Sequence, residues 1–117
     1  MDKKLTYLAC PYTSDDAELM NKRFDDVCLV AGGLMKTTDK VIYSPISHCH
    51  PIAMQTSLPT GWKFWERIDR TYLEYCCEMI VLTLPGWEES TGVQAEIKIA
   101  EELGIPIAYI NGSLWIP

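Results

Sequence analysis

The chain has 117 residues, of which 48% are hydrophobic and 22% are charged, a composition that excludes disordered and fibrous proteins. This length suits a single domain spanning residues 1–117. Sixteen acidic residues against ten basic ones give a net charge of −6, which argues against duplex nucleic acid as a partner, because binding the phosphate backbone requires a basic surface.

The hydrophobic pattern near the start predicts a strand followed by a helix. Residues 5–10 form a short apolar run closed by a proline, as a central parallel strand would be. Thr13 or Ser14 can cap a helix that runs to Gly32-Gly33 or slightly beyond. This order is typical of the start of an α/β domain.

The same alternation continues through the rest of the chain. Residues 46–61 contain two prolines and predict an irregular connection, and so long a connection in a small domain is often functional. The tail over 111–117 is expected to pair weakly at a sheet edge or to lie in a subunit contact. The other predicted elements are strands over 40–43, 79–84 and 105–110 and helices over 62–76 and 91–103.

Strands separated by helices imply right-handed crossovers and a parallel sheet with helices on both faces. We therefore expect an α/β fold, a Rossmann-like or flavodoxin-like three-layer sandwich with a parallel sheet of four to five strands. In such open sheets, ligands bind beyond the carboxyl ends of the strands. The segments expected at that edge also contain most of the chain's unusual residues.

Neither a membrane nor a metal is expected as a partner. No apolar run approaches the ~20 residues of a membrane span, and the N-terminal sequence lacks the apolar segment of a secretory signal. We expect a cytoplasmic protein whose five cysteines stay reduced. His48, Cys49 and His50 could indicate zinc, but structural zinc usually takes two spaced pairs of ligands and no second pair is obvious. No organic cofactor is expected either.

Two carboxylates lie on helix faces that should pack against the sheet. Glu96 follows Val93 by three residues, and Asp69 follows Trp65 by four. A carboxylate on such a face is costly unless it is paired, hydrogen-bonded or directed into a cleft. Each acid alone could make a surface salt bridge, whereas two acids in one crevice favour the carboxylate pair of glycosidic chemistry. The predicted apolar stripes are Val93, Ile97, Ala100 and Leu103 in one helix and Trp65, Ile68, Tyr72, Leu73 and Cys76 in the other.

Three segments together resemble the nucleoside 2-deoxyribosyltransferase superfamily. They are Y-L-A-C-P-Y over 7–12, W-x-x-W-x-x-x-D over 62–69, and E-S-T-G-V-Q-A-E-I over 89–97. Members of the superfamily begin with a similar Y-L-A-G-P-F strand and carry a G-x-x-x-E-I helix, so the match spans most of the chain in order. A largely bacterial and phage family without an assigned activity is closer still, since S-P-I-S-H-x-H-P-I-A and G-W-E-E-S-x-G-V recur in it.

The resemblance implies that Glu96 attacks C1′ of a 2′-deoxyribosyl group, that Asp69 protonates the departing base, and that the Tyr7 hydroxyl orients the nucleophile. Ser90 stands where transferases of free nucleosides carry an aspartate and where deoxynucleoside 5′-monophosphate hydrolases carry a serine that contacts the phosphate. A hydroxyl at a helix N-terminus favours a phosphate, whereas a carboxylate repels it. Cys10 replaces the family's glycine and is expected to narrow the floor of the site.

Further residues are expected to contact the substrate. Thr13 and Ser14 offer hydroxyls that either cap the first helix or bind phosphate. The two histidines of the H-C-H triplet either hydrogen-bond local backbone or lie beside the base or sugar. Trp62 is the better candidate for stacking on the base, and Trp65 is expected in the core. The predicted substrate-binding residues are Ser90, Gly92, Thr13, Ser14, His48, His50 and Trp62.

These residues together predict hydrolysis of the N-glycosidic bond of a 2′-deoxynucleoside 5′-monophosphate through a covalent Glu96 intermediate. Base exchange between deoxynucleosides is an alternative that differs only in what resolves the intermediate. A non-catalytic nucleotide-binding or sensor module is a third hypothesis, favoured if Tyr7 and Glu96 are too far apart to touch. We also expect a homo-oligomer, a dimer or higher, because sites in the superfamily are often completed by a neighbouring subunit.

Overall fold

Four helices and four strands make up the fold in a computed structural model that describes residues 4–117, and only α2 and α3 follow one another without a strand between them. Among these residues no helix is long and apolar enough to cross a membrane. The strands form one parallel sheet in the order β2-β1-β3-β4. The elements are β1 (Leu5–Ala9), α1 (Ala17–Thr37), β2 (Val41–Tyr43), α2 (Pro45–Thr56), α3 (Trp62–Glu74), β3 (Cys76–Leu82), α4 (Thr91–Leu103) and β4 (Ile107–Ile110).

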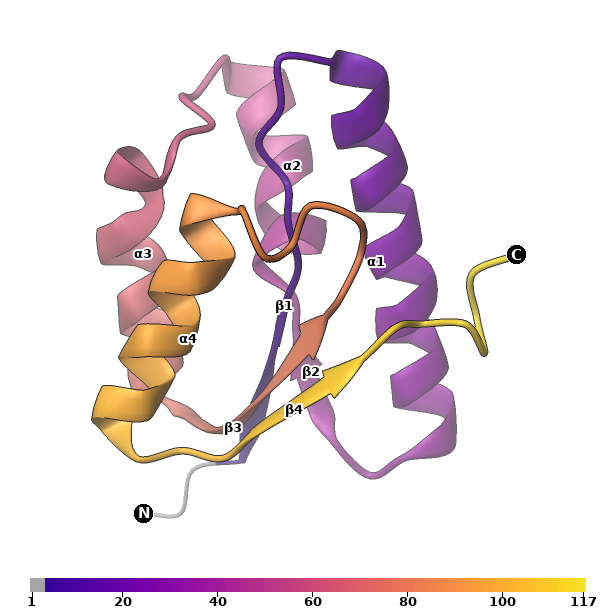
Figure 1. Ribbon diagram of the computed structural model, residues 1–117, viewed down its shortest axis with the longest axis vertical. Helices are drawn as coiled ribbons and strands as arrows, with labels where there is room; N and C mark the ends of the chain where they lie inside the picture. The colour runs from indigo at the N-terminus through magenta and orange to yellow at the C-terminus, as the bar shows by residue number, and fades with distance from the viewer. Residues whose placement is uncertain (1–3) are drawn as a thin grey trace.

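Helices cover both faces of this sheet (Figure 1). α1 and α2 pack on one face, and α3 and α4 pack on the other. The alternation of β1 explains the division, because successive side chains of a strand point to opposite faces. Leu8 belongs to the cluster under α1, whereas Tyr7 and Ala9 belong to the cluster under α3 and α4. The predicted three-layer α/β sandwich is thereby confirmed.

The strand order reverses beside β1. The chain leaves β1 through α1 to reach β2 on one side, and later crosses to β3 on the other side. The two connections diverge and leave a crevice at the carboxyl ends of β1 and β3, the switch point where open α/β sheets bind ligands. The pairing of Tyr7 with Met79 of β3 sets the register of this central strand pair.

The prediction of an irregular connection over residues 46–61 is wrong, because most of this segment forms α2. The Ser44 hydroxyl caps this helix by accepting a hydrogen bond from the Ser47 N–H at 3.2 Å. Pro45 occupies the first turn, where a missing N–H costs nothing. Pro51 lies exposed inside the helix and removes one hydrogen bond. Side chains that α2 buries in the fold offset that loss, so tertiary packing outweighs the helix-breaking tendency of proline.

The helix cap predicted at Thr13 or Ser14 is also wrong. α1 begins later, after Asp16, whose carboxylate accepts a hydrogen bond from the Glu18 N–H at 2.9 Å. The Ser14 hydroxyl accepts from the Asp16 N–H at 3.0 Å, while the Thr13 hydroxyl donates to the Thr60 carbonyl at 2.6 Å. The segment after β1 is therefore a short loop that reaches towards the start of α3.

Two further boundaries differ from the prediction. Cys76, expected at the end of a helix, is the first residue of β3 because α3 ends at Glu74. β4 begins at Ile107 because Pro106 has no N–H for the ladder, although its carbonyl accepts from the Met79 N–H at 2.9 Å. These shifts leave the order of the elements unchanged.

The C-terminal tail forms no strand, so the predicted edge pairing is wrong. It turns back over α1 (Figure 1), and Trp115 and Ile116 pack against the cluster under that helix. The tail therefore covers part of the core on the α1 side.

Gly33 is required where the tail crosses α1. A Cβ built at Gly33 would lie 2.2 Å from the Trp115 indole nitrogen, so Gly33→Ala must displace the tryptophan. We expect this variant to lower the free energy of unfolding by about 1–3 kcal/mol in chemical denaturation. Gly32→Ala is the matched control: a Cβ there meets nothing within 4 Å, and alanine in a helix interior should stabilise by about 0.5–1 kcal/mol. Changes of the same sign in the free energy of unfolding of the two variants would contradict the close contact between Trp115 and Gly33.

Candidate active site

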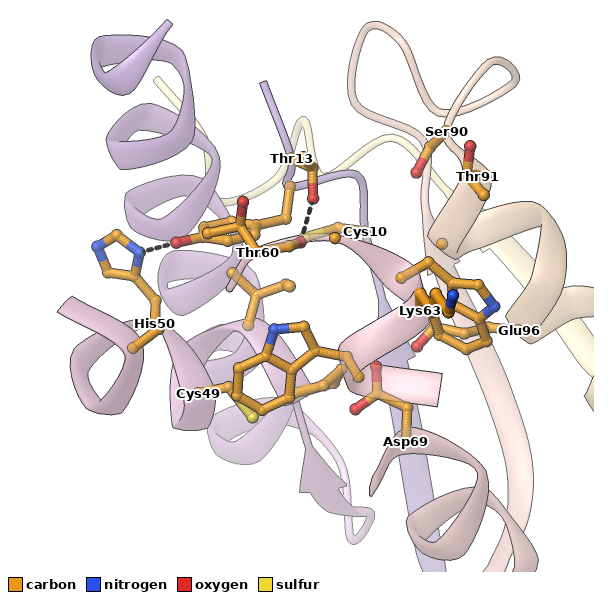
Figure 2. Close-up of a pocket in the computed structure, with 18 of the residues that line it drawn as sticks. Cys10, Thr13, Cys49, His50, Thr60, Lys63, Asp69, Ser90, Thr91 and Glu96 are labelled. Carbon is orange, nitrogen blue, oxygen red and sulfur yellow. Dashed lines mark hydrogen bonds between the residues drawn. The ribbon is translucent and has the colours of Figure 1, made fainter. Parts of the chain in front are cut away.

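A cavity of about 580 Å³ opens at the carboxyl ends of β1, β2 and β3 (Figure 2). Its walls come from the loop after β1, from α2, and from the N-terminal turns of α3 and α4. Sites for small molecules usually have volumes of about 300–1,000 Å³. The cavity therefore has the size and the position of a ligand site at the switch point of the sheet.

Glu96 lies in this cavity on the face of α4 that packs against the sheet. Its side chain is only 4% exposed. The Tyr7 hydroxyl, buried on the central strand, donates a hydrogen bond to Glu96 Oε2. The predicted stripe is partly wrong, because Leu103 is exposed and Ile97 only half-buried. The buried residues of α4 are Val93, Glu96, Ile99 and Ala100.

Asp69 enters the same cavity from α3. It is 7% exposed, and Oδ1 has no hydrogen-bond partner among the described residues. Of the residues predicted on the inner stripe of α3, only Leu73 is buried within that helix beside Asp69. Neither Asp69 nor Glu96 forms an ion pair in the described part of the chain, so the interpretation as surface salt bridges is wrong.

Burial controls the protonation of both carboxyl groups. It raises the pKa of Asp69 from 3.8 to about 7. Burial and then the charge of Asp69 raise the pKa of Glu96 well above its usual range, while the hydrogen bond from Tyr7 lowers it. The pair therefore retains at least one proton near neutral pH. Because a donor contacts Glu96 and none of the described residues contacts Asp69 Oδ1, the charge is better placed on Glu96 and the proton on Asp69.

The α4 N-terminus brings two predicted binding residues to the rim. Ser90 caps the helix, its hydroxyl accepting from the Val93 N–H at 3.2 Å, and it lines the cavity together with Gly92. Trp62 also lines the cavity, and a Cβ built at Gly92 would lie 3.8 Å from its ring. Thr13 lies on the cavity wall as well. These four residues lie where the sequence places them, on one cavity.

Two predicted binding residues lie elsewhere. Ser14 does not line the cavity and instead caps the turn before α1. His48 is exposed, with its ring centroid 6.0 Å from that of Tyr43, and is not a cavity residue. The reason for the second error is that these residues form a helix, where side chains two positions apart point in nearly opposite directions.

His50 is the histidine that reaches the cavity. It is buried, its ring packs 4.4 Å from that of Phe24, and Nδ1 is hydrogen-bonded to the Tyr12 hydroxyl. Figure 2 shows it on the opposite side of the pocket from Ser90 and Glu96. Within residues 4–117, no group of three or more His, Cys, Asp or Glu side chains is arranged to hold a metal ion.

Several cavity residues were not predicted. Trp65, expected in the core, lines the cavity, and its Nε1–H donates to the Pro59 carbonyl at 2.7 Å. Its position one turn before Asp69 is the signal that could have placed it there. Cys49 is buried in the wall, and burial raises the pKa of its thiol to about 11, so it stays protonated. Lys63, at the start of α3, carries no sequence signal of its own.

The fold and this site define a parallel α/β protein with a buried carboxyl pair in a switch-point cavity. The chain belongs to the family described as "Domain of unknown function (DUF1937)", which matches residues 4–111. That range includes all eight elements and every residue that lines the cavity. A search of curated proteins finds no match to the chain.

Proposed function

We propose that this protein hydrolyses the N-glycosidic bond of a 2′-deoxynucleoside 5′-monophosphate. The observation that carries the proposal is the presence of two buried carboxyl groups in one cavity. Glu96 has a hydroxyl donor, whereas Asp69 Oδ1 has no hydrogen-bond partner among the described residues. Enzymes that split glycosidic bonds usually use two carboxyl groups in different environments. The resemblance to the nucleoside 2-deoxyribosyltransferase superfamily supports the same assignment of roles.

The first step breaks the bond between the sugar and the base. An oxygen of the Glu96 carboxylate attacks C1′ as the C1′–N bond breaks through an oxocarbenium-like transition state. Asp69 donates its proton to the departing base nitrogen, so the base leaves neutral. Tyr7 holds the attacking carboxylate by its hydrogen bond. The products of this step are the free base and a deoxyribosyl ester of Glu96.

The second step returns the protein to its starting state. The Asp69 carboxylate removes a proton from a water molecule, whose oxygen attacks C1′ and displaces Glu96. Deoxyribose 5-phosphate leaves, Glu96 regains its charge, and Asp69 regains its proton. Glu96 thus alternates between a carboxylate and an ester, and Asp69 alternates between a protonated and an ionised carboxyl group. The raised pKa of about 7 suits Asp69 to this exchange of a proton.

Base release from a panel of the common 2′-deoxynucleoside 5′-monophosphates, followed by chromatography, tests the proposal. We expect release from at least one monophosphate and little from the matching nucleoside. A new nucleoside or nucleotide formed when a free acceptor base is added would assign base exchange instead. Ligand-induced thermal stabilisation without any release would assign a binding module.

Tyr7→Phe tests the hydrogen bond to the nucleophile. Because that bond lowers the pKa of Glu96, its loss should raise this pKa and leave less ionised Glu96 at a given pH. We expect base release to fall about 10- to 100-fold, the value of a hydrogen bond to a charged group. The acidic limb of the pH–rate profile should move to higher pH. An unchanged acidic limb would contradict the role of Tyr7.

A further inference from the structure

Lys63 stands out among the charged residues around the cavity. It is the one lysine or arginine among the described residues that line it, and its side chain is exposed. Within residues 4–117 it takes part in none of the ion pairs, which involve Lys22, Lys40 and Arg70. The cavity of an acidic protein thus presents one unpaired cation.

The position of Lys63 in α3 is unfavourable without a ligand. It lies in the first turn, where the helix carries a partial positive charge and its first N–H groups have no partner within the helix. The N-cap residue, Gly61, supplies no side-chain hydrogen bond, and the first turn contains no acidic residue. This end of α3 therefore presents uncompensated positive charge to the cavity.

The N-terminus of α4 adds a second set of donors. Ser90, Thr91 and Gly92 line the same cavity, and the first turn of α4 contains no acidic residue. Figure 2 shows Lys63 on the same side of the pocket as Ser90 and Thr91. An anion held by these groups would be attracted by two helix N-termini and by an ammonium group.

The acids of the cavity do not remove this attraction. Asp69 and Glu96 lie deep and retain at least one proton between them, so they do not act as two charges. Glu89 is exposed on the cavity rim, and its carboxylate would repel an anion. Lys63 forms no ion pair with Glu89 among the described residues, so its ammonium group stays available to an anion.

Asp69 indicates how a ligand is oriented in the cavity. Its Oδ1 is buried without a partner in the described structure, so it is available for a hydrogen bond with a ligand. In Figure 2, Asp69 lies on the side of Lys63 away from Ser90 and Thr91. A ligand that satisfies both ends has a donor-bearing or protonatable group near Asp69 and an anionic group near Lys63.

We propose that Lys63, together with the N-terminal turns of α3 and α4, binds the 5′-phosphate and makes the cavity select nucleotides over nucleosides. This inference rests on the proposed function for the identity of the ligand. Its readout is binding, which does not depend on turnover.

The test compares dissociation constants for a 2′-deoxynucleoside 5′-monophosphate and its nucleoside, measured by calorimetry in a Glu96→Gln background so that neither is consumed. Lys63→Gln should reduce the preference for the monophosphate by about tenfold or more, and Lys63→Arg should retain most of it. Lys98→Gln, which removes the same charge from the exposed side of α4, should leave it unchanged. Glu89→Gln should increase it.

Two outcomes would overturn the inference. One is equal binding of monophosphate and nucleoside by the Glu96→Gln protein that still contains Lys63. The other is a preference for the monophosphate that Lys63→Gln leaves intact. Selective binding that depends on Lys63 supports the inference even if the unmodified chain releases no base. Binding that depends on Lys63 but is not followed by base release would count against the proposed reaction alone. Failure of the inference and failure of the proposed reaction are therefore distinguishable.

Discussion

Glu96→Gln should abolish base release, lowering the rate by at least about 10³-fold, as expected for loss of a nucleophile. Glutamine has nearly the same volume, and its amide oxygen can still accept the hydrogen bond from Tyr7. The variant therefore removes the attacking charge with little change in packing. Base release under single-turnover conditions measures the effect.

The control for this variant lies on the same helix. Glu101 is exposed on α4 and does not line the cavity, so Glu101→Gln should keep full activity. Glu96→Gln should also be at least as stable as the unmodified protein in thermal unfolding, because it removes a buried acid. Base release by Glu96→Gln at the rate of the unmodified protein would exclude Glu96 as the nucleophile.

Asp69→Asn should lower activity and raise stability. Loss of a general acid usually costs about 10²- to 10⁴-fold in rate, and the loss should be greatest for bases that leave poorly without a proton. Asparagine also removes a buried group that is ionised at high pH. The two effects have opposite signs, which separates a catalytic role from a structural one.

The gain in stability depends on pH. Because the pKa of Asp69 is raised to about 7 in the folded protein, the folded state binds the proton more tightly than the unfolded state. Below about pH 4 the acid is protonated in both states, and stability is then lost as the pH rises towards 7. Asp69→Asn should avoid that loss and be more stable at pH 8 by on the order of 2–4 kcal/mol.

Chemical denaturation at pH 4 and pH 8 measures this difference. The control is Asp25→Asn, which removes an exposed aspartate of α1 and should change stability little at either pH. An Asp69→Asn variant whose stability relative to the unmodified chain is the same at both pH values would contradict the burial of an ionisable carboxyl at this position.

Local periodicity was enough to predict the two carboxyl groups of the site. Helical spacing placed Glu96 and Asp69 on inward faces, because burial follows the period of the helix, and both are buried there. Tyr7 was identified only through the family resemblance, and it too is buried. The four strands and three of the four helices were predicted from the same kind of pattern, and their alternation largely determines a parallel α/β sheet.

Features that depend on tertiary packing were not predicted. Pro51 indicated an irregular loop, but burial of the other face of α2 stabilises a helix there, and this separates His48 from His50. Lys63 has no special sequence environment, and its relation to Ser90 exists only because α3 and α4 start at the same edge of the sheet. No local pattern contains that information.

In the proposed reaction, Glu96 becomes covalently bonded to C1′ of the sugar. A 2′-deoxy-2′-fluoroarabinonucleotide 5′-monophosphate should trap this ester, because fluorine destabilises the oxocarbenium-like transition state and slows hydrolysis of the intermediate. Intact-protein mass spectrometry after incubation, followed by peptide mapping, should show one 2-deoxy-2-fluoroarabinosyl 5-phosphate adduct on Glu96 and none in Glu96→Gln. Base release accompanied by an adduct on another residue would contradict the role of Glu96 as the nucleophile.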